Sequence, residues 1–296
     1  MKTQANTRIG GRHRRAALLG CVLTCALFTP VLSAPAGNVD TELLLLVDIS
    51  GSINDKEFEQ MMGSYARAMT SSSVLDAIQS GATGSIATAV MFWAGASEQQ
   101  VGVSWMKISD LASANQFAQA VTAAVKPFAG KTALATAMNE AVPLFGKETG
   151  GTDNGFASLA QIMNVSGDGV DNDSGTRTRD RSVYVDQARD AALAAGVDMI
   201  NGLALNDNDG TDRSDSIRGY YAAHVIGGET GGTRAFVEYA ENQDVFEDAL
   251  VKKLRAEISA GAQNSISAVP EPATSVTAAA GLLVLALRRR REAIAG

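Results

Sequence analysis

The chain has 296 residues, of which 46% are hydrophobic, 5% aromatic and 19% charged. This composition suits one globular domain with processing segments and excludes a disordered or fibrous protein. The formal net charge is −7. Because basic residues gather at the two ends, the segment 37–287 is more acidic than the whole chain, which argues against nucleic acid as the partner.

The rare residue types narrow the chemistry further. Both cysteines, Cys21 and Cys25, lie in an apolar N-terminal stretch, so removal of that stretch leaves no thiol for a disulfide, a zinc site or a nucleophile. The two histidines are His13 and His224, which excludes a metal site built from several imidazoles. Side-chain oxygen atoms and backbone groups therefore remain as the possible ligands of a metal ion.

The first 36 residues have the three parts of a secretory signal peptide. Five basic residues precede an apolar run over 16–32, and the small residues Ala34 and Ala36 follow on either side of Pro35. We therefore expect residues 1–36 to be removed when the protein is exported.

Residues 38–260 alternate between apolar runs of strand length and longer segments with helical spacing. This pattern predicts an α/β domain with a mainly parallel sheet covered by helices. Strands are expected at 42–47, 86–93, 101–106, 161–165, 197–205 and 234–239, the third being an edge strand because its apolar residues alternate. Helices are expected at 55–69, 109–125, 134–145, 183–195, 214–223 and 244–259. Residues 261–268, rich in Ser, Ala, Gly and Asn, are expected to form a spacer.

One carboxylate and two hydroxyls follow the first buried strand. In extended chain alternate residues face the same way, so Asp48, Ser50 and Ser52 can point at a common position. Open parallel sheets bind ligands outside the carboxyl ends of their strands, where this motif falls. Hydroxyl and carboxylate oxygens suit a hard cation such as Mg²⁺.

Two later segments offer further oxygen atoms. Gly130-Lys131-Thr132 opens an expected helix and supplies the Thr132 hydroxyl, and Asp168 follows the expected strand 161–165 and supplies a second carboxylate. Three strand ends or helix starts thus provide five oxygen-bearing side chains for one divalent cation.

In these motifs, their order and their spacing, the chain resembles the von Willebrand factor A (vWA) domain with its metal-ion-dependent adhesion site. The resemblance covers about residues 41–257 and looks like a bacterial branch whose function is not established. It implies a three-layer, doubly wound, Rossmann-like fold with a mostly parallel six-stranded sheet and one antiparallel edge strand. It also implies the ligands: Ser50, Ser52 and Thr132 bind the cation directly, and Asp48 and Asp168 bind it through water.

The resemblance further implies one open coordination position, which predicts binding rather than catalysis. Hydroxyl ligands neutralise little of the cation's charge, so the cation attracts an anionic oxygen, such as the carboxylate of a protein, matrix or glycan partner. A local cation also reverses the field of an acidic domain at the contact. We expect Mg²⁺, with Mn²⁺ and Ca²⁺ as alternatives.

Other interpretations of these residues stay open. Asp48 is placed where the nucleophile of a phosphotransfer enzyme would be, so a metal-dependent envelope hydrolase or phosphatase is the alternative function, although such enzymes usually carry a second carboxylate where Ser50 stands. A serine hydrolase would need His224 as its base. A phosphate-binding loop ending at Thr132 would need glycine at Val125. A structural matrix protein with a vestigial site is a third possibility.

Two acidic loops are candidate calcium sites, at residues 171–173 and 206–215. Neither has the twelve-residue pattern of a calcium hand, because the glutamate at its last place is missing. A solvated loop is the simpler interpretation of both.

The C-terminal 28 residues, 269–296, have a distinctive order. Val269-Pro270-Glu271-Pro272 is followed by an apolar stretch over 273–287 and then by four consecutive arginines. As a helix this stretch spans about 22 Å, less than the roughly 30 Å of a membrane core, so a transient membrane contact is expected. The segment resembles the PEP-CTERM sorting tail, which implies processing by an exosortase in a Gram-negative-type bacterium; an ordinary C-terminal membrane helix is the alternative.

Overall fold

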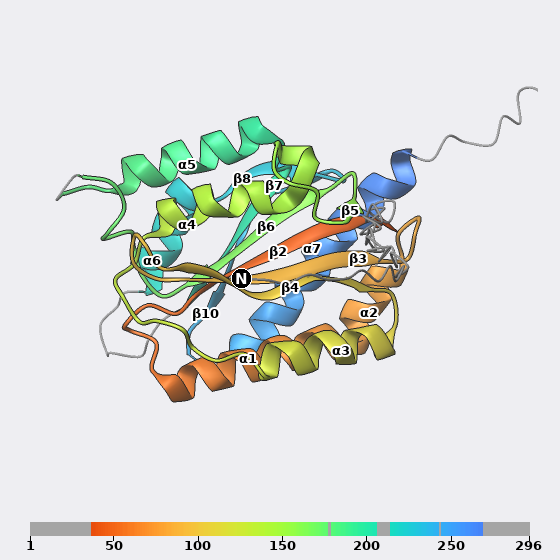
Figure 1. Cartoon of the computed structure of the whole chain (residues 1–296), viewed down its shortest axis with the longest axis horizontal. Coiled ribbons are helices and arrows are strands. Elements are labelled where there is room, and N and C mark those ends of the chain that lie inside the picture. Colours follow the sequence, from red (N-terminus) through yellow and green to blue (C-terminus); the bar gives the residue numbers. More distant parts are fainter. Residues whose placement is uncertain (1–36, 177–178, 206–213, 243, 269–296) are drawn as a thin grey trace, which may run out of the picture. The chain divides into compact units, whose positions relative to one another are not determined.

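A mostly parallel β-sheet is the middle layer of the described part of the chain (Figure 1). The computed structural model describes residues 37–176, 179–205, 214–242 and 244–268, so the expected signal peptide and sorting tail lie outside the described residues. At the centre of the sheet, β2 (Thr41–Asp48) is buried at every position. Its unbroken apolar run is typical of a parallel strand that is covered on both faces.

Within these ranges, the parallel strands follow the order β3 (Ile86–Trp93), β2, β6 (Gln161–Gly167), β7 (Met199–Leu205) and β10 (Val237–Ala240). The edge strand β4 (Gln99–Ile108) pairs with β3 in the antiparallel direction. The predicted fold class and the predicted edge strand are therefore confirmed. A hairpin of β8 (Gly227–Thr230) and β9 (Thr233–Arg234), which the sequence did not predict, adds to the start of β7.

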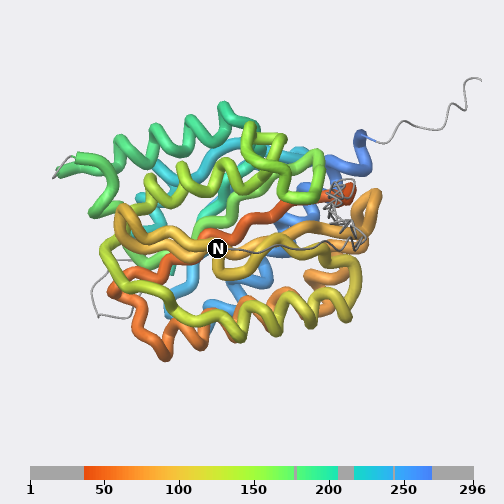
Figure 2. The backbone as a smooth tube through the Cα atoms, viewed as in Figure 1, coloured from red at the N-terminus to blue at the C-terminus, as the bar shows by residue number. Residues whose placement is uncertain are grey.

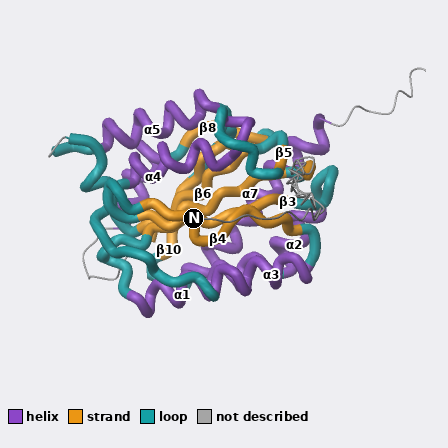
Figure 3. The backbone as a smooth tube through the Cα atoms, viewed as in Figure 1, coloured by secondary structure: helices purple, strands orange, loops and turns teal. Residues whose placement is uncertain are grey.

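Each face of β2 points into its own apolar core. Leu43, Leu45 and Val47 pack on one face, and Leu44 and Leu46 pack on the other. Figure 3 shows the two layers of helices that cover these faces. The first face is covered by α1 (Asp55–Thr70), α2 (Ser72–Gln79), α3 (Leu111–Thr122) and α7 (Phe246–Ala268). The second is covered by α4 (Leu134–Ala141), α5 (Ser182–Ala195), α6 (Ser214–Tyr220) and the π-helical segment Tyr221–Val225.

The expected spacer over 261–268 is wrong, because helix α7 continues to Ala268. Gly261, Ala262 and Ser265 are buried in its last turns. A Cβ on Gly261 would lie 1.9 Å from Thr41 Oγ1, so the small residues allow the helix to approach the start of β2. Their composition reflects close packing rather than flexibility.

Three smaller differences have local causes. The expected helix 134–145 ends at Ala141, and Pro143 follows in a 3₁₀ segment, Val142–Thr149. The expected strand 234–239 is divided, because Arg234 pairs with β8 and β10 begins only at Val237. Helix α2 was not expected, since it has only eight residues and begins within a run of three serines.

The described chain begins and ends at the same end of the sheet, as the red and blue ends of the tube show (Figure 2). Strand β1 (Gly37–Asn38) pairs with β5 (Phe156–Ala157) in a separate two-stranded sheet. Asn38 and Ala268 line one pocket there. This is the amino end of β2, so its carboxyl end, which carries the candidate residues, faces the other way.

Candidate metal centre

The candidate residues come from the ends of two neighbouring strands and from the start of one helix. Asp48 is the last residue of β2. Strand β6 pairs with β2 in parallel and ends at Gly167, immediately before Asp168. Thr132 stands just before α4. The topology therefore brings together segments that are far apart in the sequence.

Hydrogen bonds join four of the candidate residues. Ser50 N donates to Asp48 Oδ1 at 2.8 Å. The hydroxyls of Ser50 and Ser52 are 3.2 Å apart, and Ser52 Oγ donates to Asp168 Oδ1 at 2.9 Å. The first motif and Asp168 thus form one continuous polar cluster.

Thr132 is held near this cluster by its backbone. Gly51 N donates to Gly130 O at 2.8 Å, which ties the first motif to the segment of Thr132. Thr132 N donates to Asn172 Oδ1 at 3.0 Å, and Thr132 O accepts from Asn172 N at 2.8 Å. Thr132 Oγ1 lies 3.6 Å from the position that a Cβ on Gly169 would take, so the threonine hydroxyl faces the Asp-Gly turn.

These segments surround a cavity of about 260 Å³. The cavity is lined by Ser50, Gly51, Ser52, Gly130, Lys131, Thr132, Asp168, Gly169, Val170 and Asn172. Asp48 does not line it but lies beneath Ser50, with no exposed surface. A water molecule occupies about 30 Å³ in the liquid, so the cavity has room for a hydrated cation and an incoming group.

The electrostatics of Asp48 favour a cation at this position. Burial, together with the charge of Asp168, raises the pKa of Asp48 to about 8. Asp48 Oδ2 is buried and has no hydrogen-bond partner among the described groups, which is costly unless a charge or a water molecule compensates it. Two buried carboxylates close together destabilise each other until a positive charge is placed near them.

The donor set fits a hard divalent cation. Three hydroxyls and two carboxylates provide oxygen only, as Mg²⁺ prefers. No group of three or more His, Cys, Asp or Glu side chains that could hold a metal occurs in the described ranges. A centre at this place therefore depends on Ser50, Ser52 and Thr132 as much as on the carboxylates.

Sequence reasoning missed the role of Asp171. This residue is buried, and its carboxylate accepts from Ala135 N at 2.8 Å, from Ser174 N at 2.9 Å and from Asp173 N at 3.2 Å. The bond to Ala135 caps the start of α4, beside Thr132. Asp171 is thus a structural residue of the site and not part of a solvated loop. The second acidic loop, 206–215, lies almost wholly outside the described residues.

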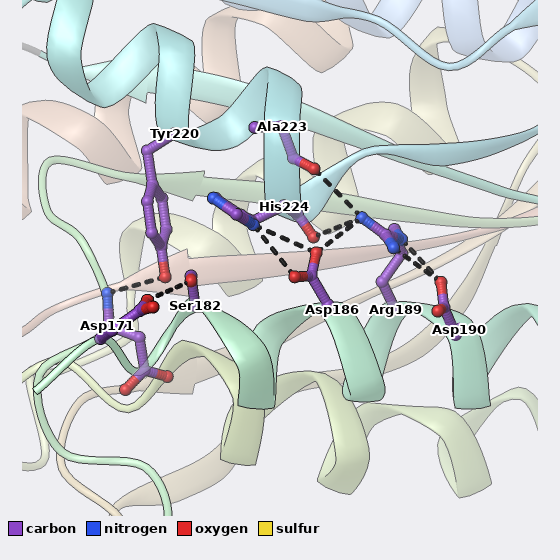
Figure 4. A network of polar contacts seen from close by, with 9 residues as sticks. Asp171, Ser182, Asp186, Arg189, Asp190, Tyr220, Ala223 and His224 are labelled. Carbon is purple, nitrogen blue, oxygen red and sulfur yellow. Dashed lines mark hydrogen bonds and ion pairs between the residues drawn. The ribbon is translucent and has the colours of Figure 1, made fainter. Parts of the chain in front are cut away.

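His224 takes part in a surface network rather than in a catalytic pair (Figure 4). Its Nδ1 lies 3.1 Å from Asp186 Oδ1 on α5, and Arg189 Nη1 lies 3.0 Å from the same oxygen. Arg189 also donates to the backbone oxygens of Ala223 and His224. Among the described contacts, His224 meets a carboxylate and not a serine hydroxyl, which gives no support to a serine hydrolase.

The chain belongs to the family described as "protein of unknown function (DUF1194)", which matches residues 38–262. Its mostly parallel sheet, covered by helices on both faces, is the Rossmann-like architecture that the resemblance in the motifs implied. No curated protein matches the chain. The family's description names no activity.

Several solved structures are similar to this chain. The pilus adhesin SpaC from Lactobacillus rhamnosus GG is 14% identical over 76% of this chain and 31% of its own, with a TM-score of 0.51. Proximal thread matrix protein 1 from the mussel byssus is 14% identical over 76% of this chain and 50% of its own, with a TM-score of 0.50. A von Willebrand factor type A protein from Catenulispora acidiphila is 14% identical over 76% and 43%, with a TM-score of 0.46. The chain thus spans half or less of the length of these proteins.

The PEP-CTERM protein-sorting motif matches residues 268–291. This motif indicates export to the cell envelope or surface of a bacterium and processing by an exosortase. None of the helices in the described ranges is both long and apolar enough to cross a membrane. The apolar segment 273–287 lies outside those ranges.

Proposed function

We propose that this protein is a divalent-cation-dependent binding module of the bacterial envelope, which captures an acidic group of a protein, matrix or glycan partner. The observation that carries the proposal is the convergence of the Ser50, Ser52, Thr132 and Asp168 side chains on one cavity. The buried Asp48 Oδ2, without a partner among the described groups, lies beneath them.

Each candidate residue has a role in this proposal. Ser50, Ser52 and Thr132 hold the cation directly, and Asp48 and Asp168 hold it through water. When bound, the cation supplies positive charge and one open coordination position for a carboxylate oxygen. Mg²⁺ is the proposed cation because the donor set contains oxygen only; Mn²⁺ and Ca²⁺ are the alternatives.

The position of the centre on the domain supports display to a partner. The sorting motif begins at the end of α7, and the candidate residues lie at the opposite end of β2. Eight residues of strand separate the two ends by about 26 Å. While the tail is in the membrane of a Gram-negative-type cell, the cavity can therefore face away from it.

The phosphatase alternative is less well supported. A nucleophile must be reached by its substrate, whereas Asp48 is fully buried and is not among the residues that line the cavity. Adhesion and matrix proteins among the similar structures also favour binding over catalysis.

The proposal is tested with the double variant Ser50→Ala, Ser52→Ala. We expect Mg²⁺ to raise the melting temperature of the wild type and to allow capture of a partner from envelope extract, and we expect a chelator to reverse both effects. The double variant should show neither effect. Ser72→Ala with Ser73→Ala, two serines in the first turn of α2, is the matched control and should behave as the wild type.

Two results would overturn this function. If the melting temperature of the wild type did not change on addition of Mg²⁺, Mn²⁺ or Ca²⁺, the protein would be a structural protein with a vestigial site. Hydrolysis of a phosphate ester by the wild type, lost in Asp48→Ala, would establish the enzyme instead.

A further inference from the structure

The hydroxyl of Tyr221 lies beside the proposed metal centre without a hydrogen-bond partner among the described groups. Tyr221 is fully buried, and its Oη, like Asp48 Oδ2, is a buried polar atom that no described group pairs with. Both atoms lie close to the place where a side chain on Gly167 would begin. A Cβ placed there would lie 2.6 Å from Tyr221 Oη and 2.8 Å from Asp48 Oδ2. A donor and an acceptor, both available for a bond, thus flank this glycine.

Two glycines on neighbouring strands make room for this side chain. Gly167 ends β6, and Gly202 lies on β7, where a Cβ would be 2.7 Å from Tyr221 Cδ1. Neither glycine has a positive φ, so the backbone conformation does not require glycine at either position. The absence of both side chains instead allows the Tyr221 ring to reach the end of β2.

The backbone at Tyr221 is unusual as well. Residues Tyr221–Val225 form a π-helical turn, closed by a bond of 3.1 Å from Ile226 N to Tyr221 O. Such turns are rare and occur frequently at functional sites. The preceding Tyr220 lies near the loop of the site, since its Oη accepts from Asp171 N at 3.4 Å.

The hydroxyl of Tyr221 is protonated at neutral pH, because the ordinary pKa of tyrosine is about 10. Burial raises the pKa of Tyr221 well above its usual value, and the charges of Asp48 and Asp168 raise it further. The hydroxyl can therefore act as a hydrogen-bond donor towards the carboxylates.

We propose that Tyr221 is a positioning residue of the metal centre, whose hydroxyl donates to Asp48 Oδ2 when a divalent cation is bound. The inference rests on the proposed function. Asp48 Oδ1 already accepts from Ser50 N, so the bond from Tyr221 fixes the second oxygen and with it the orientation of the carboxylate. Oδ2 keeps one lone pair for a water molecule of the cation.

The test is Tyr221→Phe in the whole exported protein, with Tyr239→Phe as the matched control. Tyr239 also has a buried hydroxyl without a partner among the described groups, but it lies on β10, which pairs with β7 and not with β6. Groups that hydrogen-bond to metal ligands contribute about 10–100-fold to affinity. We expect Tyr221→Phe to weaken Mg²⁺ binding about tenfold in calorimetry, and Tyr239→Phe to leave it unchanged.

The melting temperature in chelator distinguishes the proposed role of the Tyr221 hydroxyl from a purely structural role. The proposed role predicts the following result. Tyr221→Phe removes a buried polar atom that no described group satisfies, so the melting temperature in chelator should equal or exceed that of the wild type. A lower melting temperature with unchanged Mg²⁺ affinity would overturn the inference.

A spectroscopic measurement on the unmodified side chain keeps the inference testable if the variant misfolds. Mg²⁺ should change the tyrosine absorbance of the wild type and of Tyr239→Phe, and a wild type that binds Mg²⁺ with no such change contradicts the role of Tyr221. If the wild type binds no divalent cation, the proposed function itself fails, which is a separate result.

Discussion

Ser52 Oγ donates a hydrogen bond of 2.9 Å to Asp168 Oδ1, across 116 positions of the sequence. The bond joins the loop after β2 to the loop after β6, so it links the two halves of the candidate centre. The Asp48 and Asp168 carboxylates lie close enough to interact: after burial, the charge of Asp168 is the next cause of the raised pKa of Asp48. The two carboxylates therefore repel each other where both are ionised, as the pH approaches and passes about 8.

The first prediction concerns how the repulsion between Asp48 and Asp168 affects the stability of the domain. Asp168→Asn keeps an acceptor for Ser52 and removes one negative charge, so the domain in chelator should become more stable than the wild type as the pH rises to about 8 and above, where Asp48 ionises. A gain of about 1 kcal/mol raises the melting temperature of a domain of this size by about 3 °C. The response to Mg²⁺ should be lost at the same time. Thermal unfolding in chelator and in Mg²⁺ measures both effects.

Asp173→Asn is the control for this prediction. Asp173 accepts from Ala96 N at 3.0 Å and pairs with Lys131 at 3.2 Å, so its charge is stabilising where it stands. The variant should lose stability in chelator and keep the response to Mg²⁺. A lower melting temperature of Asp168→Asn in chelator would contradict the repulsion.

The second prediction concerns the cap of α4. Asp171→Ala leaves Ala135 N and Ser174 N without their acceptor, which should cost about 1–3 kcal/mol in the free energy of unfolding. Asp171→Asn keeps one acceptor oxygen and should cost less. Urea unfolding in chelator measures both variants. Added Ca²⁺ should leave the difference between Asp171→Ala and the wild type unchanged, and a difference that appears only with Ca²⁺ would instead identify a calcium site.

A comparison of Asp48 with Asp171 shows how much of the candidate site could be predicted from the sequence. Asp48 directly follows the expected strand 42–47, and Ser50 and Ser52 repeat at the period of extended chain, so a local pattern was sufficient to propose that these three side chains share one site. The role of Asp171 depends on the N–H of Ala135, which the fold places beside it from 36 positions away. No local pattern contains that contact.

The fold shows the same division between local and tertiary information. The central strand was predicted because a short, unbroken apolar run is typical of a parallel strand buried on both faces. Residues 261–268 were assigned to a spacer because small residues suit a flexible linker and a closely packed helix equally well. Only the contact of Gly261 with Thr41 decides between them. The approach of Tyr221 to Asp48 likewise depends on a π-helical turn and on two glycines of other strands.

The third prediction concerns pH and the opposite end of β2. Glu42 is fully buried and accepts from Asn154 Nδ2 at 2.6 Å and from Ser158 Oγ at 3.0 Å. Burial raises the pKa of Glu42 in the folded protein. The folded state thus binds this proton more tightly than the unfolded chain, so the stability due to protonated Glu42 is present at low pH and is lost as the pH rises through the raised pKa.

Glu42→Gln removes this dependence. The free energy of unfolding of the variant, relative to the wild type, should increase as the pH rises from about 4, by about 1.4 kcal/mol for each unit by which the pKa is raised. The amide's altered hydrogen bonds add an offset that does not change with pH. Urea unfolding over a pH series in chelator gives the difference. The control is Glu140→Gln, at an exposed glutamate of α4. If the free energies of unfolding of Glu42→Gln and the wild type changed in parallel with pH, the raised pKa of Glu42 would be contradicted.

The last prediction compares two glycines inside helices. Alanine at an exposed helical glycine normally adds about 0.5–1 kcal/mol of stability. At Gly63 on α1 a Cβ would meet only the far end of the Arg67 side chain, at 3.0 Å, so Gly63→Ala should stabilise the domain by about this amount. At Gly261 the Cβ would overlap Thr41 Oγ1 and force α7 away from β2, and overpacking of this kind costs about 1–3 kcal/mol. Opposite signs of the two changes in urea unfolding are expected. Equal stabilisation by both would mean that residues 261–268 do not pack on the sheet, and that the spacer predicted from their composition is present after all.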